Sequence, residues 1–180
     1  MRNRKSLLLV LTLSFFFVSC EETTENKTEE TKTENPTAEV SSDGPITANV
    51  NGNLFSGFDM VSSIQKLETE LFTSLTFLAT SMDGEALTMS ILNYSGVGKY
   101  MLGSEAVTVE NSTPNIAVFV RSNSEDPANS ESWSAIKGEV VITEEKNGKM
   151  KGTFNFITKN GNKGGDVLTV TDGKFDLKVK

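Results

Sequence analysis

Alternation between apolar and polar positions is clearest in the last third of the chain. From Lys174 to Lys180 every second residue is apolar and the others are charged, which is the period of a strand with one buried and one wet face. The stretch 150–158 alternates in the same way and places Phe154 and Phe156 on one side. We therefore expect strands over both stretches, with the two phenylalanines in the core.

Four dipeptides of the Asn-Gly or Asp-Gly type separate these runs. Such pairs readily adopt the positive φ angles of a type I′ hairpin turn, so we expect an antiparallel hairpin at each of them. The expected hairpins join 46–50 to 54–58 at Asn51-Gly52, 71–80 to 86–93 at Asp83-Gly84, 138–143 to 150–158 at Asn147-Gly148, and 167–171 to 174–180 at Asp172-Gly173.

One more strand is expected over 116–121, and only 60–71 offers an alternative to strands. Val61, Ile64 and Leu67 have helical spacing there, but the stretch is short and contains two serines, so helix is the minor alternative. About ten strands at close spacing indicate an all-β fold, an antiparallel β-sandwich or barrel. Periodicity does not distinguish the sandwich from the barrel.

The chain begins with a different pattern. Three basic residues precede an apolar run from Leu7 to Ser19, and the run ends at Cys20. The run has the length of a signal peptide's apolar region and is too short to span a bilayer as a helix. We expect 1–19 to be a lipoprotein signal peptide that is removed at Cys20, the lipidated residue. An ordinary secretory signal that leaves a free thiol is the alternative.

Cys20 is the only cysteine of the chain, so no intramolecular disulfide can form. Lipid attachment gives this single thiol a role, and several acyl chains at about 0.8 kcal/mol per buried CH₂ would anchor the protein permanently. The membrane is therefore an expected partner, through the lipid on Cys20. Glu21 and Glu22 follow directly. They resemble the acidic export signal of Bacteroidetes lipoproteins, which implies a surface-exposed, lipid-anchored place on the outer membrane.

Composition divides the remainder into a linker and one domain. Residues 20–44 hold eight acidic residues, two lysines and almost nothing apolar, which predicts a disordered acidic linker. Of the 17 basic and 24 acidic residues in the chain, three basic ones lie in the signal peptide, so 12 basic and 16 acidic ones remain in 45–180. We expect 45–180 to form a single domain that binds no nucleic acid, because it carries no basic stripe.

Several sequence motifs resemble those of a family of Bacteroidetes lipoproteins of unknown function. The family commonly ends in a G-T-F-x-F strand followed by a T-N-G-x-F hairpin. Here G-T-F-N-F begins at Gly152 and T-D-G-K-F at Thr171, and Asp172 stands where asparagine is usual. The opening T-A-N-V-N-G-N-L-F and the middle G-K-Y-M-L-G extend the resemblance over most of 45–180. The resemblance supports an all-β fold and a lipoprotein address, and it implies no particular activity.

The residue inventory excludes several mechanisms. The chain has no histidine, which removes Ser-His-Asp and Cys-His catalysis and imidazole-ligated metals. A hydrolase that uses carboxylates alone needs two opposed acidic groups. Inside the domain the close acidic pairs are Glu68 with Glu70 and Glu144 with Glu145. We interpret both pairs as surface charge, so no catalytic residue and no cofactor is expected.

Two polar segments and three aromatic residues are the remaining candidates. The loop 124–132 has the oxygens for calcium but not the spacing of a calcium motif, so no metal is expected there; these oxygens belong to Glu125, Asp126, Asn129 and Glu131. Residues 160–165 are interpreted as a hairpin tip. Trp133, Tyr94 and Tyr100 lie near expected strand ends, where amphipathic rings either contact a ligand or pack at the edge of the core.

Three functions are consistent with these observations. The first is a noncatalytic binding or adhesion domain on an outer-membrane lipoprotein, with a glycan, a peptide or another envelope protein as partner. The second is a lipocalin-like barrel that carries an apolar small molecule, which requires an internal cavity. The third is a hydrolase with carboxylates alone. We expect the first and do not expect an enzyme.

Overall fold

The computed structural model describes residues 44–106, 114–161 and 164–180. The signal peptide, Cys20, Glu21, Glu22 and the linker up to residue 43 lie outside the described residues. The described part is all-β, with helical geometry confined to three-residue 3₁₀ turns. Within it we find no helix with the length and apolarity that crossing a membrane requires.

Ten strands make up the domain, which confirms the predicted fold class. They are β1 (Ile46–Val50), β2 (Asn53–Ser56), β3 (Ser63–Glu68), β4 (Thr73–Thr80), β5 (Glu85–Ile91), β6 (Gly98–Leu102), β7 (Ile116–Arg121), β8 (Glu131–Lys146), β9 (Lys149–Asn160) and β10 (Val167–Lys178). The 3₁₀ turns are η1 (Asp59–Val61), η2 (Ser104–Ala106) and η3 (Pro127–Asn129).

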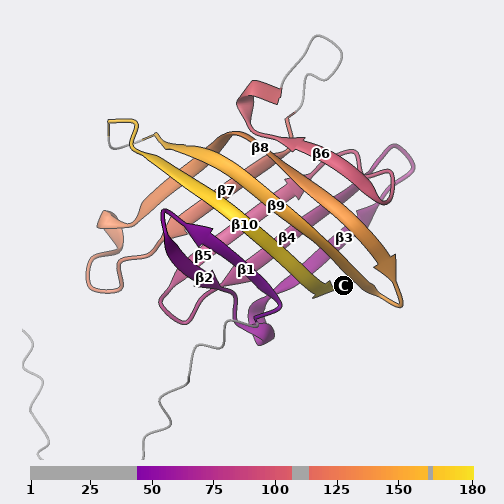
Figure 1. Cartoon of the computed structure of the whole chain (residues 1–180), viewed down its shortest axis with the longest axis horizontal. Coiled ribbons are helices and arrows are strands. Elements are labelled where there is room, and N and C mark those ends of the chain that lie inside the picture. The colour runs from indigo at the N-terminus through magenta and orange to yellow at the C-terminus, as the bar shows by residue number, and fades with distance from the viewer. Residues whose placement is uncertain (1–43, 107–113, 162–163) are drawn as a thin grey trace, which may run out of the picture. The chain divides into compact units, whose positions relative to one another are not determined.

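The strands form one curled antiparallel sheet, a half-barrel. Its order is β2-β1-β10-β9-β8-β7-β5-β4-β3, and β6 pairs with the second half of β8. At one end the curl brings β3 against the C-terminus, where Lys180 N donates to Ile64 O at 2.7 Å and Lys66 N donates to Lys180 O at 3.1 Å. Figure 1 shows the result: β1, β9 and β10 cross in front of β4, β5 and β7. The sheet therefore supplies both layers around its own core.

Two of the expected hairpins have the predicted turn. Asn51 and Gly52 have φ angles of 49° and 88°, and Asn147 and Gly148 have 53° and 69°, as a type I′ turn requires. These turns join β1 to β2 and β8 to β9. The hairpin between β4 and β5 is also confirmed, but its loop spans 81–84 and only Gly84 has a positive φ.

The hairpin expected at Asp172-Gly173 is wrong. Both residues lie inside the single strand β10, which pairs with β9 along its whole length. The dipeptide forms a β-bulge there: Asp172 has a φ of 54°, and the register shifts between Val170 and Gly173. An Asp-Gly pair supplies left-handed geometry equally well for a turn or a bulge. The long partner strand β9 decides for the bulge, because it continues the ladder on both sides.

The stretch 60–71 forms η1 and the strand β3 in place of the helix considered as a minor alternative. β3 pairs with β4 from Ser63 to Glu68, and its other edge contacts the C-terminus. Tertiary pairing therefore overrides a helical spacing of apolar residues that was only two turns long. The strand carries Lys66, which pairs with Glu145 at the end of β8.

The core lies between the two layers of the curled sheet. Phe77 of β4 meets Phe175 of β10 with ring centroids 5.0 Å apart at 67°, and Phe55 of β2 meets Phe119 of β7 at 5.9 Å and 77°. Edge-to-face pairs of this kind stabilise beyond the area they bury. Phe154 and Phe156 are also buried, as predicted. The two layers are thus joined directly through aromatic rings.

The contact between the layers generates a stability prediction. We expect Phe77→Ala to lower the free energy of unfolding of the full chain by about 3–5 kcal/mol, because it empties a fully buried site between the layers. A double-mutant cycle with Phe175→Ala should give a coupling of about 0.5–1.5 kcal/mol in urea titrations. Leu54→Ala, on a side chain that is 57% exposed, is the control and should cost about 0.5 kcal/mol or less. A coupling near zero would contradict the proposed contact.

Candidate functional site

Trp133 is part of the core's edge. It lies on β8, is 4% exposed, and packs against Phe119 with ring centroids 6.3 Å apart. The Arg121 guanidinium lies over the rings of both Trp133 and Phe119, at 5.7 and 6.0 Å from their centroids, and pairs with Glu85 at 2.9 Å. The indole Nε1 has no hydrogen-bond partner within the described part of the chain. Of the two roles considered for this ring, packing is the one that its burial supports.

Tyr94 and Tyr100 come together at the opposite end of the core. Their ring centroids are 5.7 Å apart, and Tyr94 is only 9% exposed. The Tyr94 hydroxyl donates to Glu145 Oε2 at 2.5 Å, and the Tyr100 hydroxyl donates to Gly96 O at 2.5 Å. Both hydroxyls are thus engaged within the protein. Tyr94 therefore offers no open face for stacking, and Tyr100 is partly buried against the core.

Lys66 organises this end of the molecule. Its Nζ lies 2.8 Å from Glu68 Oε1 and 3.3 Å from Glu145 Oε1, and 5.7 Å from the centroid of the Tyr94 ring. The hydrogen bond from Tyr94, and then the one from Lys66, hold the pKa of Glu145 below its usual range. Burial raises the pKa of the Tyr94 hydroxyl, and the hydrogen bond to Glu68 raises that of Lys66. The cluster fastens β3 to the end of β8.

This cluster bears on the carboxylate candidates. Glu68 and Glu145 each belong to one of the two acidic pairs that the sequence singles out, and the fold brings these two residues to one lysine. A catalytic carboxylate pair needs an open approach for a substrate. Here the Lys66 ammonium lies within ion-pairing distance of both carboxylates and offsets part of their charge. Ion pairing accounts for their positions.

In the loop 124–132 the Asp126 carboxylate is bonded within the loop. Asp126 caps η3: its Oδ1 accepts from Ala128 N at 3.2 Å and its Oδ2 from Asn129 Nδ2 at 2.7 Å. Asn123 Oδ1 accepts from the backbone N–H groups of Glu125 and Asp126, both at 3.0 Å. Over the described ranges no group of three or more acidic, histidine or cysteine side chains is arranged to hold a metal ion. The loop is a hydrogen-bonded turn at the end of the sheet.

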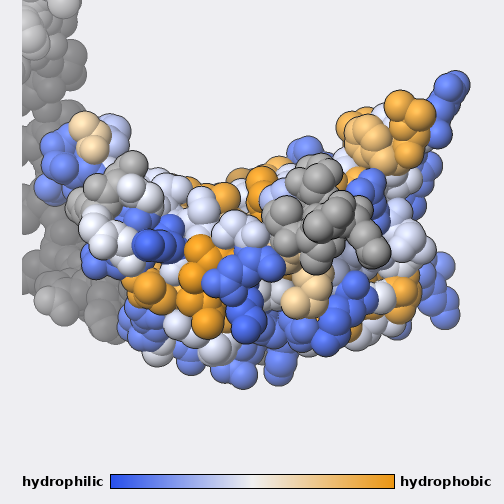
Figure 2. Space-filling model, turned by 90° about the horizontal axis from the view of Figure 1, so that it is seen from above, coloured by the Kyte–Doolittle hydropathy of each residue, from blue (hydrophilic) through white to orange (hydrophobic). Residues whose placement is uncertain are grey.

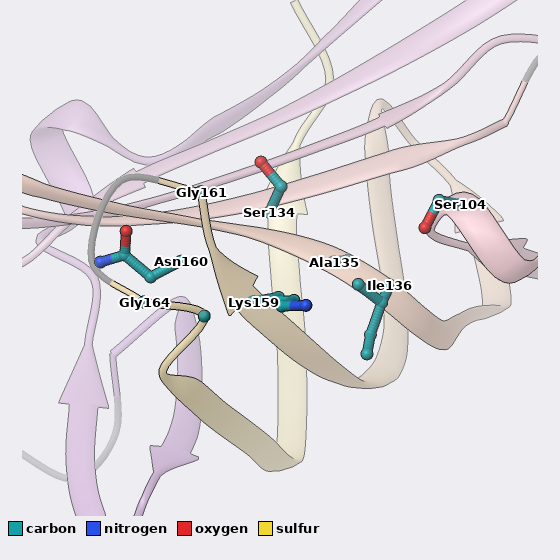
Figure 3. A pocket seen from close by; sticks show the side chains of 9 residues that line it. Ser104, Ser134, Ala135, Ile136, Lys159, Asn160, Gly161 and Gly164 are labelled. Atoms are coloured by element: carbon teal, nitrogen blue, oxygen red, sulfur yellow. The ribbon is translucent and has the colours of Figure 1, made fainter.

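A pocket of about 520 Å³ lies where β8 and β9 meet the tip between β9 and β10. Figure 3 shows Ser134 to Ile136 on one side, Lys159 and Asn160 on another, and Ser104 at the far margin. Lys159 is the one charged side chain among its lining residues. A lone lysine beside small residues has no acid or base partner for catalysis. The pocket is a hollow beside the expected hairpin tip at 160–165.

The outward side of the β3-β4-β5-β7 layer is the most distinctive surface of the domain. Strand alternation and register place fourteen accessible residues there, beside the buried Ser63, and the row continues onto the start of β8. None of them is charged. We call this surface the uncharged face: Gln65, Leu67, Ser74, Thr76, Leu78, Thr80, Ala86, Thr88, Ser90, Ile116, Val118, Val120, Ser132 and Ser134.

The opposite layer shows the usual surface pattern. Its exposed residues on β9 and β10 include five lysines and two aspartates, and several of them form ion pairs across the strands. Lys151 lies 3.5 Å from Asp176 and 3.9 Å from Glu144, and Lys149 lies 3.6 Å from Asp176. Surfaces of soluble domains ordinarily mix charges of both signs in this way. The absence of charge on the other face is therefore a local property and does not reflect the composition of the whole domain.

The uncharged face is hollowed. Figure 2 shows the domain concave on its upper side, which is the side of the β4-β5-β7 layer, with hydrophobic surface along the floor and on a raised end. The turn between β3 and β4 adds exposed apolar groups beside Leu67: Leu71 is 92% exposed and Phe72 is 41% exposed. The Thr69 hydroxyl fixes this turn by accepting from Leu71 N at 3.3 Å and Phe72 N at 3.1 Å.

Sequence reasoning missed this face, although the sequence contains a signal for it. No charged residue occurs from Leu71 to Met82 or from Ala86 to Gly98, and serine and threonine alternate with apolar residues in both stretches. Two neighbouring half-buried strands without charge predict an outward face without charge. The candidates chosen from the sequence were aromatic, and the fold uses those rings for packing.

The cluster around Lys66 makes a testable prediction. We expect Tyr94→Phe to raise the pKa of Glu145 toward the ordinary value of 4.5, because the tyrosine hydrogen bond is the main cause of its depression. A depressed pKa stabilises the fold above the ordinary value, and this contribution is lost as the pH falls through the depressed one. The variant should therefore be about 1 kcal/mol less stable at neutral pH and lose less stability on acidification.

Carboxyl NMR titration and urea unfolding at several pH values measure these effects. Tyr100→Phe is the matched control, since its hydroxyl donates to the Gly96 carbonyl and not to Glu145. An unchanged pKa of Glu145 in Tyr94→Phe would refute the assigned hydrogen bond.

Comparison with known proteins confirms that the domain belongs to a family of unknown function. Residues 42–177 match the family described as a domain of unknown function, DUF6252. No curated protein and no solved structure matches the chain. The matched range begins before β1 and ends inside β10, so it includes every strand around the core. On this evidence the chain is a member of the DUF6252 family.

Proposed function

We propose that the protein is an outer-membrane lipoprotein whose β domain binds a partner noncatalytically on the uncharged face. The observation that carries the proposal is the contrast between the two layers of the sheet. One outward face holds lysines and acidic residues in ion pairs. The other holds no charged residue at any of its fourteen positions. Depletion of charge is what distinguishes the buried centre of an interface from ordinary protein surface.

The exposed apolar groups at the rim support the same assignment. Leu67, Leu71 and Phe72 stand beside the face, and a hydrogen-bonded turn holds Leu71 almost fully exposed. Contiguous exposed apolar surface is costly for a solitary soluble domain and is typical of a contact site. The rim and the floor together form a contact surface that is hollow, uncharged and partly apolar.

A filled interior favours this proposal over an apolar carrier. The space between the layers holds large side chains that are almost completely inaccessible, including Phe55, Phe77, Phe119, Phe154 and Phe156. A carrier of lipocalin type would need to keep that space open for its cargo. Because these rings contact one another across the layers, a ligand could enter only by displacing the core.

The proposed cellular location, lipid-anchored on the outer membrane, is supported by the sequence alone. The basic head, the short apolar run and the single cysteine predict lipidation at Cys20, and Glu21 and Glu22 resemble a surface-export signal of Bacteroidetes lipoproteins. A lipid anchor followed by a strongly acidic linker would hold the domain away from anionic headgroups. Such an arrangement leaves the uncharged face available to partners in the envelope or outside the cell.

The address can be tested by labelling the full chain in cells. We expect radiolabelled palmitate to enter the wild-type chain and to be absent from Cys20→Ser, which should leave the membrane fraction. Glu21→Ala combined with Glu22→Ala should keep the label and the membrane location but lose sensitivity to protease added to intact cells. Equal protease sensitivity with and without the two glutamates would refute the export assignment, and palmitate on Cys20→Ser would refute the anchor.

Occupation of the uncharged face can be tested by thiol protection. We expect Thr88→Cys, at the centre of the face, to react with a membrane-impermeant maleimide at least tenfold more slowly on intact cells than after purification of the full chain. Thr169→Cys, on the outward side of β10, is the matched control and should react equally in both settings. Equal reactivity of Thr88→Cys in both settings would contradict a bound partner.

A further inference from the structure

The uncharged face is rich in hydrogen-bonding groups as well as apolar ones. Each cross-strand row mixes the two kinds: Thr88 stands between Leu78 and Val118, and Val120 stands between Ala86 and Ser132. Within the face, the hydroxyl oxygens of Thr76 and Ser90 are 3.4 Å apart, within hydrogen-bond distance. Among the described residues the hydroxyls of Thr88, Ser132 and Ser134 show no bond to another protein group. These hydroxyls are free to bond with a ligand.

A charged occupant does not suit this surface. Burying a carboxylate or an ammonium group without a counter-charge costs several kcal/mol, and no side chain of the face can pair with either. Around the face, Lys66 pairs with Glu68 and Glu145 at one end and Arg121 pairs with Glu85 at the other. Lys159, beside Ser134 in the β8–β9 register, and Glu70, in the β3–β4 turn, lie at its margins, so the floor itself offers no counter-charge. The occupant should therefore be uncharged where it touches the face.

A purely apolar occupant does not suit it either. Covering the face with an apolar helix would deprive its hydroxyl and amide groups of water, and it would leave those outside the Thr76–Ser90 pair without the partner that water provides. Each buried group left unsatisfied costs about 1–3 kcal/mol, and the face carries eight residues with such groups. The occupant should therefore offer many hydrogen-bond donors and acceptors in addition to apolar surface.

From these two exclusions we infer that the uncharged face binds a neutral polysaccharide strand. This inference rests on the proposed function and names its ligand class. A neutral sugar chain presents hydroxyls along its edges and C–H groups on its ring faces, which match the alternating hydroxyl and aliphatic side chains of the floor. The hollow seen in Figure 2 suits an elongated convex ligand. Phe72 precedes β4 on the side of Ser74, so its 41% exposed ring is placed to stack on a sugar.

The inference is tested with the full chain purified in detergent and a fixed panel of soluble polysaccharides. The neutral members are dextran, laminarin and galactomannan, and the anionic members are alginate and polygalacturonate. We expect affinity electrophoresis and calorimetry to detect binding to at least one neutral member and to neither anionic one. Thr88→Lys should weaken that binding at least tenfold, and Phe72→Ala should weaken it about threefold to tenfold.

A matched control variant separates loss of binding from loss of folding. Thr169→Lys adds the same charge on the outward side of β10 and should bind like the wild type. Urea unfolding of both lysine variants should give similar stabilities, so that a binding defect in Thr88→Lys is local. Equal binding by Thr88→Lys and wild type, preference for the anionic members, or binding to none of the panel would overturn the polysaccharide assignment.

Failure of the polysaccharide assignment can be distinguished from failure of the proposed binding function. Protection of Thr88→Cys on cells, combined with no binding to any neutral polysaccharide, would keep the binding face and reject this ligand class. No protection on cells together with no binding would reject both. Protection that disappears after treatment of the cells with enzymes that degrade neutral glycans would support both.

Discussion

The close approach of phenylalanine rings to glycines on neighbouring strands is the constraint from which the rest of this structure follows. In each of three cross-strand pairs a Cβ added to the glycine would lie 2.4–2.5 Å from an atom of the phenylalanine side chain. At Gly152 and Gly173 that atom belongs to the ring, which only glycine lets lie across the backbone; at Gly138 it is the Cβ of Phe156. Rings that cover strand glycines in this way allow a sheet to bend without exposing its backbone. The pairs are Gly138 with Phe156, Gly152 with Phe175, and Gly173 with Phe154.

Bending at these pairs explains why one sheet can supply two layers. The paired glycines lie on the three longest strands, β8, β9 and β10, which form the centre of the sheet order. Their curl carries the C-terminus to β3 and Phe175 to Phe77. Of the two outward faces, the one formed by β9 and β10 carries ion pairs, and the one formed by β3, β4, β5 and β7 is hollow and uncharged. The G-T-F-N-F and T-D-G-K-F segments of this chain thus have a structural role.

The sequence predicts the local elements of this fold better than their connections. Alternation locates β9 and β10, and Asn51-Gly52 and Asn147-Gly148 locate two type I′ turns, because these signals are carried by adjacent residues. Asp172-Gly173 misleads because left-handed geometry serves a bulge as well as a turn, and only the partner strand decides between them. The same limit applies to the site. Whether Trp133 is open or covered depends on Phe119 and Arg121, which only the fold places against it.

The shape of the uncharged face also limits what can cover it. A symmetric dimer needs a patch that is complementary to itself. In the profile that Figure 2 shows, two such hollow faces are not complementary, so a second copy of the chain fits the floor poorly. The charged outward side of β9 and β10 does not suit it either, since its lysines would meet no counter-charge there. Hollowness and lack of charge are therefore the two properties on which the proposed binding rests: the partner we propose would be convex and neutral where it contacts the face.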